Sequence, residues 1–128
     1  MPTRVLVDTN FLLIPVRFKV DIFTDSSDAV NDLTEFYVSS KVLNEIRLLK
    51  EKSKPSFVKE LRLAETYAGQ CTLIEDPGNG EVDDSLVNLA SRERMVLGTT
   101  DSELRQKARK AGVKVIYLRQ RNYLVLDG

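Results

Sequence analysis

Four segments of the sequence each carry a carboxylate where a buried strand is predicted to end or a helix to begin. Asp8 follows the apolar run "RVLV", and Asp101 follows the run "MVLGT". Glu45 lies one turn into a predicted helix, and the tandem acids Asp83 and Asp84 lie in the first turn of another. Carboxylates gathered from such distant segments would repel one another, and a bound cation would remove that repulsion.

A set of this kind selects a hard divalent cation. At ~5 Å and an effective dielectric constant of ~20, each pair of carboxylates costs roughly 3 kcal/mol. Ligands that are all oxygen favour Mg²⁺ or Mn²⁺ over zinc or copper, and such ions polarise phosphodiesters and lower the pKa of bound water. The sequence has no histidine, which excludes a histidine-based nuclease and a Ser-His-Asp hydrolase.

Each acid also has a purely structural explanation. Asp8 fits a helix N-cap, and Glu45 fits a weak surface pair with Lys41. The acids of "VDDS" suit the positive end of a helix dipole, and the segment "TDSE" around Asp101 fits a capping box. These explanations do not account for the placement of all four segments at the same edge of the predicted sheet.

The elements that must position the acids alternate between short apolar strands and amphipathic helices. This alternation predicts an α/β fold, a three-layer α/β/α sandwich with a parallel sheet of about five strands, in one domain over residues 1–128. Ligands of such sheets bind beyond the carboxyl ends of the strands. The predicted strands cover residues 4–9, 36–40, 71–75, 95–100 and 113–118. The predicted helices cover residues 10–16 (interrupted by Pro15), 21–33, 41–52, 53–67, 81–93 and 102–112, and residues 76–80 form a loop.

Composition narrows the class of protein further. No apolar stretch approaches the ~20 residues that span a membrane, and the first ten residues lack the pattern of a signal peptide. The single cysteine, Cys71, has no partner for an internal disulfide, so we expect a cytoplasmic location. The net charge of zero is the sum of segments of opposite charge. Residues 65–84 contain acidic but no basic residues, whereas bases outnumber acids in residues 41–62 and 101–128. This segregation suits a protein that holds cations in one place and phosphates in another.

The segments "VLVDTN", "SSKVLNEI", "VDDSLVNLA" and "LGTTDSEL" resemble, in order and spacing, the four acidic motifs of PIN-domain ribonucleases. The resemblance covers nearly the whole chain and is strongest to the archaeal branch related to the PIN endonuclease of the small-subunit processome. It implies the strand order 3-2-1-4-5, binding of one or two Mg²⁺ or Mn²⁺ ions, and endonucleolytic cleavage of single-stranded RNA by a homodimer.

The resemblance also assigns roles to individual residues. The catalytic, metal-binding acids it implies are Asp8, Glu45, Asp83 and Asp101. The family has a small residue seven positions beyond its aspartate. That residue falls on Ala90 for Asp83, which is therefore preferred. For Asp84 it falls on Ser91, which is also small, so Asp84 is kept as an accessory metal ligand. Asn10 and Thr99 match positions that support the acids by hydrogen bonding.

Basic residues follow the acids along the chain and are expected to guide a phosphate backbone to them. Lys52 also follows Glu45 on the same predicted helix, although it is not among the residues to which RNA binding is assigned. Those to which we assign RNA binding are Arg47, Lys50, Arg105, Arg109, Arg119 and Arg121. The function predicted is a metal-dependent endoribonuclease in RNA processing, with ribosomal RNA and a pre-ribosomal particle as candidate substrate and partner. Two alternatives stay open: the toxin of a toxin–antitoxin pair, and a non-catalytic RNA-binding or assembly module.

Overall fold

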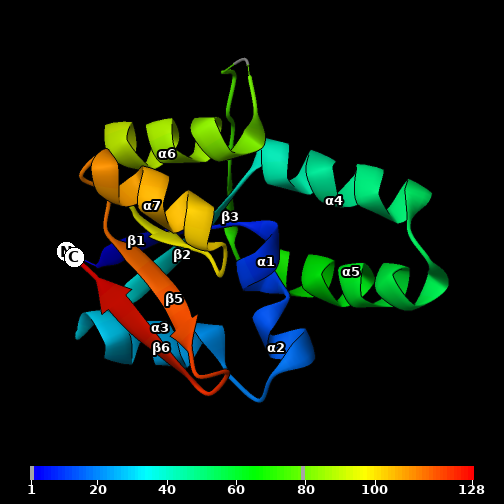
Figure 1. Cartoon of the computed structure of the whole chain (residues 1–128), viewed down its shortest axis with the longest axis horizontal. Helices are drawn as coiled ribbons and strands as arrows, with labels where there is room; N and C mark the ends of the chain where they lie inside the picture. Colours follow the sequence, from blue (N-terminus) through cyan, green and yellow to red (C-terminus); the bar gives the residue numbers. More distant parts are fainter. Residues whose placement is uncertain (1, 79) are drawn as a thin grey trace.

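The structure is a computed structural model that describes residues 2–78 and 80–128, and it contains a six-stranded sheet with helices on both faces (Figure 1). Met1 and Asn79, the latter in the predicted loop 76–80, lie outside the described residues. The strands are β1 (Thr3–Val7), β2 (Thr34–Ser39), β3 (Thr72–Ile74), β4 (Val96–Gly98), β5 (Val115–Arg119) and β6 (Tyr123–Asp127). The helices are α1 (Thr9–Leu12), α2 (Ile14–Arg17), α3 (Ile22–Val30), α4 (Ser40–Lys52), α5 (Pro55–Ala68), α6 (Val82–Glu93) and α7 (Ser102–Lys110).

The sheet confirms the predicted order and adds a sixth strand. Its order is β3-β2-β1-β4-β5-β6, and the first five strands in sequence run parallel. β6 pairs antiparallel with β5, with Arg119 opposite Tyr123, in a region where the sequence predicted no strand. The intervening turn holds Gln120 and Arg121 at φ values of 54° and 56°. Hairpin turns usually place glycine or asparagine in this left-handed region, whereas here glutamine and arginine occupy it and the one asparagine of the turn, Asn122, follows them.

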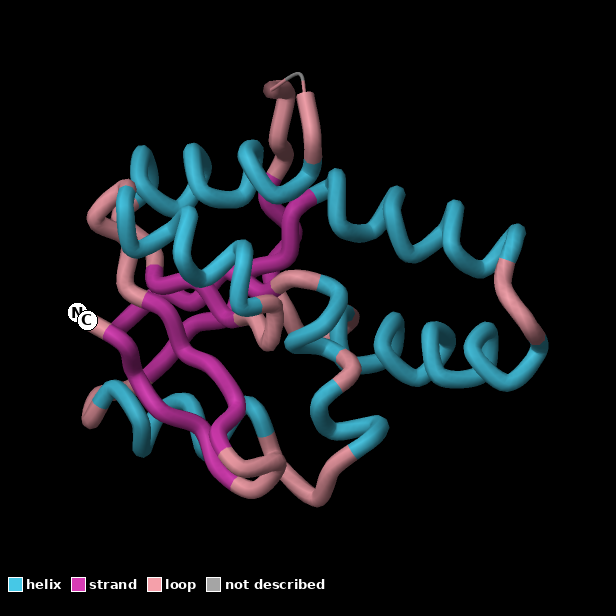
Figure 2. Tube along the Cα trace, viewed as in Figure 1, coloured by secondary structure: helices cyan, strands magenta, loops and turns pink. Residues whose placement is uncertain are grey.

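The helices divide between the two faces and one edge of the sheet. α6 and α7 cover one face and α3 lies on the other, while α4 and α5 form an antiparallel pair beside α1 and α2, at the edge where β1 and β2 end (Figures 1 and 2). Pro15 stands in the first turn of α2 rather than inside one longer helix, and Pro55 opens α5. No helix among residues 2–78 and 80–128 is both long and apolar enough to cross a membrane.

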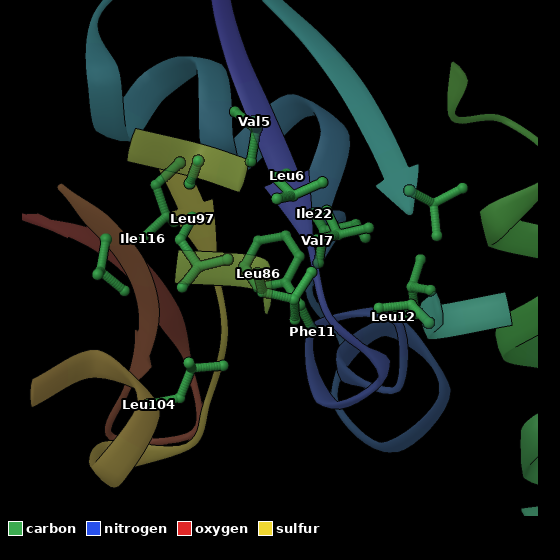
Figure 3. Packing of buried hydrophobic residues seen from close by; sticks show 14 of the residues in the cluster. Val5, Leu6, Val7, Phe11, Leu12, Ile22, Leu86, Leu97, Leu104 and Ile116 are labelled. Atoms are coloured by element: carbon green, nitrogen blue, oxygen red, sulfur yellow. The ribbon is translucent and has the colours of Figure 1, made fainter. Parts of the chain in front are cut away.

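β1 is the centre of the core and places the first acid. Val5, Leu6 and Val7 are fully buried, and Figure 3 shows them among apolar side chains from α1, α6, β4 and β5. Val7 pairs in register with Gly98 at the end of β4. The residues that follow these two strands, Asp8 and Thr99, therefore leave the sheet side by side.

A close contact between β4 and α1 fixes the direction in which the chain leaves β1. A Cβ atom at Gly98 would lie 3.0–3.1 Å from ring carbons of the buried Phe11. The backbone N–H of Asp8 also donates to the carbonyl of Gly98 at 3.1 Å. Because Phe11 lies directly on the Gly98 backbone, the first turn of α1 is held against the end of β4.

We expect Gly98→Ala to lower the free energy of unfolding by about 1–3 kcal/mol, because the added methyl group would push the Phe11 ring out of a filled core. Denaturant unfolding of Gly98→Ala, Phe11→Leu and the double variant measures this. Leucine at position 11 leaves space for the methyl group, so the double variant should be more stable than the sum of the single losses predicts. Simple additivity of the two losses would show that the ring and the glycine are not coupled.

Candidate active site

Asp8 both caps a helix and lies buried at the end of β1. Its side chain is the N-cap of α1, where Oδ1 accepts a hydrogen bond from the backbone N–H of Phe11 at 2.7 Å. Oδ2 accepts a hydrogen bond from the hydroxyl of Thr99. With only 5% of its surface exposed, Asp8 is a carboxylate held by two donors and removed from water.

The environment of Asp8 disfavours its charged form. Burial raises its pKa to about 7, and the hydrogen bonds from Thr99 and Phe11 offset only part of this effect. The negative charges of Asp83 and Glu45 raise the pKa further. Acids from β1, α4 and α6 thus act on one another across the carboxyl edge of the sheet.

Glu45 is oriented by Thr9, a residue to which the sequence assigned no role. Ser39 caps α4 by accepting a hydrogen bond from the N–H of Val42 at 3.2 Å, and Glu45 follows one turn later. The hydroxyl of Thr9 donates to Oε1 of Glu45 at 2.6 Å. The surface pair between Glu45 and Lys41 that helical spacing suggested is not among the ion pairs of the described residues.

Asp101 and Asp83 form the other side of the cluster. Oδ1 of Asp101 caps α7 by accepting from the N–H groups of Glu103 at 2.9 Å and Leu104 at 3.4 Å, so Asp101 itself is the cap of this helix. Burial raises the pKa of Asp83, and the charge of Asp101 is the next cause. A neighbouring negative charge therefore adds to the rise in the pKa of Asp83, as it does for Asp8.

The tandem acids of α6 face different neighbours. Asp84 is exposed, and its Oδ1 lies 3.5 Å from Nζ of Lys107 in an ion pair. Asp83 is half-buried: burial and the charge of Asp101 raise its pKa, while the Lys107 ammonium lowers it without pairing with it directly. This difference separates two neighbours that the sequence distinguished only by the spacing to a small residue.

Of the two residues predicted to support the acids by hydrogen bonding, Thr99 bonds an acid side chain and Asn10 does not. Thr99 is buried, donates to Asp8, and accepts a hydrogen bond from the backbone N–H of Asp101 at 3.0 Å, so one hydroxyl joins two acids. Asn10 is exposed, and among the described residues its side chain forms no hydrogen bond to an acid. The hydroxyl that reaches Glu45 comes instead from Thr9.

The donor set fits a hard divalent cation in its chemistry. Asp8, Glu45, Asp83 and Asp101 offer only carboxylate oxygens. Burial raises the pKa of Asp8 and of Asp83, and the charges of the neighbouring acids raise it further, a repulsion that a cation relieves. Within residues 2–78 and 80–128, no three acid or thiol side chains stand close enough to hold a metal ion as they are. The side chains would therefore have to close around a cation as it binds.

Four of the six residues assigned to RNA binding form ion pairs. Arg47 lies 3.1 Å from Glu51 and Lys50 lies 2.7 Å from Glu65. Arg105 and Arg109 both reach Asp127, at 3.9 Å and 3.6 Å, and Arg105 also lies over the ring of Tyr117. Arg119 and Arg121 are exposed at the β5–β6 turn. Only the pair of Arg47 with Glu51 follows from helical spacing, because the other pairs join residues from different elements.

A groove of about 590 Å³ lies beside Glu45 along α4. Its lining combines amine, amide, hydroxyl and carboxylate groups with apolar side chains: Ser40, Lys41, Asn44, Glu45, Leu48, Leu49, Lys52, Gly80 and Val82. Lys41 was considered in the sequence only as a surface partner of Glu45. In the structure its Nζ donates to the hydroxyl of Ser85 at 2.6 Å, close to the acids of α6.

Two known proteins that are similar to this chain in sequence are both ribonucleases. The chain is 28% identical over 130 residues to Ribonuclease VapC4 of Methanocaldococcus jannaschii, covering 98% of this chain and 97% of that protein. It is 29% identical over 126 residues to Ribonuclease VapC9 of Archaeoglobus fulgidus, covering 90% and 82%.

Solved structures show the same fold. The PIN domain endonuclease Utp24 matches with a TM-score of 0.79 and 21% identity, covering 98% of this chain and 92% of that one. VapBC2 from Rickettsia felis, bound to a DNA fragment from their promoter, matches with a TM-score of 0.58 and 15% identity, covering 81% and 92%. A family model described as a PIN-like domain matches residues 5–121, which include all four acidic segments. The chain belongs to the PIN-like domain family.

Proposed function

We propose that this protein is a metal-dependent endoribonuclease that cleaves single-stranded RNA in RNA processing. The observation that carries the proposal is a set of acids from distant segments at one edge of the sheet: burial raises the pKa of Asp8 and of Asp83, and the charges of neighbouring acids, Asp83 and Glu45 for Asp8 and Asp101 for Asp83, raise it further. Acids whose pKa values are perturbed by burial and by neighbouring charges are typical of a functional site. The names of the curated relatives, both ribonucleases, support the same activity.

The residues of this chain would hold one or two Mg²⁺ or Mn²⁺ ions. Asp8, Glu45, Asp83 and Asp101 would bind the cation, and Thr9 and Thr99 would orient the carboxylates through the hydrogen bonds described above. When bound, such a cation polarises the phosphodiester and shields the charge that develops on it. Until then, a proton on the carboxylate of Asp8 relieves the same repulsion, because its pKa is about 7.

A second candidate role is supported by the names of the relatives. Two of them are VapC ribonucleases, and one solved neighbour is a VapBC complex. In that role the protein would be the toxin of a pair, with a small antitoxin as partner. Growth arrest on expression, relieved by a neighbouring gene, would distinguish it from a processing enzyme. A pre-ribosomal partner, homodimerisation and a cytoplasmic location stay predictions from the sequence.

Asp8→Asn and Asp83→Asn should each abolish Mn²⁺-dependent cleavage of a single-stranded RNA, since each removes a charge that the cation needs. Gel assays of a labelled oligonucleotide, with and without EDTA, measure this. Asp28→Asn, at an exposed acid of α3, is the matched control and should cut at the wild-type rate. Asp84→Asn should lose far less activity than Asp83→Asn, because Asp84 pairs with Lys107. Cleavage that survives both Asp8→Asn and Asp83→Asn would remove the proposal.

In EDTA, the wild-type protein should lose stability as the pH rises from 5 to 8. The pKa of Asp8 is higher in the folded chain than in the unfolded one, so its proton stabilises the fold fully below about pH 4 and is lost through pH 7. Asp8→Asn keeps a neutral group there, so at pH 8 it should melt about 5–10 °C above the wild type, a gap that shrinks at pH 5.

Addition of Mn²⁺ at pH 8 should raise the melting temperature of the wild type and leave that of Asp8→Asn nearly unchanged, because a ligand stabilises only the form that binds it. Asp28→Asn should follow the wild type at every pH. A wild-type protein that gains stability from pH 5 to 8 in EDTA relative to Asp8→Asn would contradict the raised pKa.

A further inference from the structure

One face of α4 carries a stripe of four groove residues that the proposed cation site uses only in part. Positions 41, 45, 48 and 52 are spaced by four, three and four residues, which places their side chains on one face of a helix. The stripe reads Lys41, Glu45, Leu48 and Lys52, and all four line the groove. At ~1.5 Å per residue, the two lysines stand about 16 Å apart along the helix axis, on either side of Glu45.

The two lysines differ from the other bases of α4. Arg47 and Lys50 are engaged by Glu51 and Glu65. Within residues 2–78 and 80–128, neither Lys41 nor Lys52 takes part in an ion pair. An ammonium group without a carboxylate partner is available to a phosphate.

Lys41 is held in place by groups from outside α4. Its Nζ donates to the hydroxyl of the buried Ser85, two residues after Asp83. The neighbouring Ser40 accepts a hydrogen bond from the backbone N–H of Asp76 at 3.0 Å, which ties the chain after β3 to the start of α4. These contacts fix one end of the groove beside the acids of α6.

Part of the groove between the lysines is apolar. Leu48 is 44% exposed, and Leu49 and Val82 line the groove with it. An exposed leucine beside ammonium groups suits a ligand that presents a flat apolar face next to negative charges. Unpaired bases and their phosphates have this combination, whereas in a duplex the base faces are stacked on one another.

We infer that the groove along α4 binds a few nucleotides of single-stranded RNA, with Lys41 and Lys52 pairing with phosphates on either side of Glu45 and a base lying on Leu48. This inference rests on the proposed function and names how the same site takes its substrate. The two ammonium groups position the strand so that the phosphodiester between them faces the acid cluster. Lys41 and Lys52 are therefore positioning residues.

The test measures RNA binding apart from cleavage. Fluorescence anisotropy of a labelled 12-nucleotide oligouridine in EDTA, at several KCl concentrations, gives the affinity and its dependence on salt. Lys41→Met and Lys52→Met should each weaken binding about three- to tenfold and lower the slope of log affinity against log salt by ~0.7, the loss expected for one phosphate contact. Lys59→Met, at an exposed lysine of α5 outside the groove, is the matched control and should change neither quantity.

A second pair of variants tests the apolar part of the groove. Leu48→Ala should weaken binding, because a base loses its apolar contact, without changing the salt slope. Leu63→Ala removes a leucine that is equally exposed, at 46%, on α5 and should bind as the wild type does. Arginine at positions 41 and 52 should restore the affinity and the slope, since it keeps the charge.

Cleavage in Mn²⁺ provides an independent readout: KM should rise in both lysine variants while kcat changes little. Unchanged affinity and slope in Lys41→Met and Lys52→Met would overturn the inference even if the wild type cuts RNA. A duplex that binds as tightly, and loses as much from the same substitutions, would overturn the assignment to a single strand. Lysine-dependent binding without any cleavage would leave the groove intact and remove the proposed nuclease function instead. Lys52 is exposed, so its result does not depend on whether Lys41→Met disturbs the fold.

Discussion

The burial of a carboxylate at the end of the central strand is the constraint on which the site depends. Asp8 is 5% exposed, and two donated hydrogen bonds do not restore the hydration that its charge loses, so its pKa stands near 7. The charges of Glu45 and Asp83 add to the cost. The fold therefore stores electrostatic free energy at one edge of the sheet. A proton or a cation releases it, and the proposed chemistry requires the cation.

Contacts of the surrounding backbone place the acids at this edge of the sheet. Gly98 lets the Phe11 ring lie directly on β4, which fixes the turn that carries Asp8. The hydroxyl of Thr9 then holds the side chain of Glu45, and that of Thr99 joins the side chain of Asp8 to the backbone N–H of Asp101. In Asp8 and Asp101, Oδ1 is the oxygen that caps the helix, so capping leaves the second oxygen to other partners, which for Asp8 is the hydroxyl of Thr99. The structural and chemical roles of these acids are thus compatible.

The sequence was most informative where an answer depended on short-range pattern. Alternating apolar strands and amphipathic helices predicted five parallel strands, because buried parallel strands are short apolar runs, while their order in the sheet was implied by the family resemblance. The sequence did not predict β6, because the turn before it places Gln120 and Arg121, rather than glycine, at positive φ. Contacts between distant segments were invisible: the bond from Thr9 to Glu45 and the pairing of Lys50 with Glu65 leave no trace in local spacing. The different neighbours of Asp83 and Asp84 likewise appeared only once α6 and α7 were packed together.

The position of Lys41 shows how one helix can serve two ligands of opposite charge. Helical spacing alone would pair Lys41 with Glu45 four residues later, and that pair would neutralise a carboxylate that a cation needs. The structure separates them: the hydroxyl of Thr9 donates to Glu45, and Lys41 donates to Ser85 on α6. Because each charge is held by a neutral hydroxyl, neither cancels the other. Glu45 then remains available to a cation and Lys41 to a phosphate, a division of charge that suits the proposed hydrolysis of a phosphodiester by a bound metal ion.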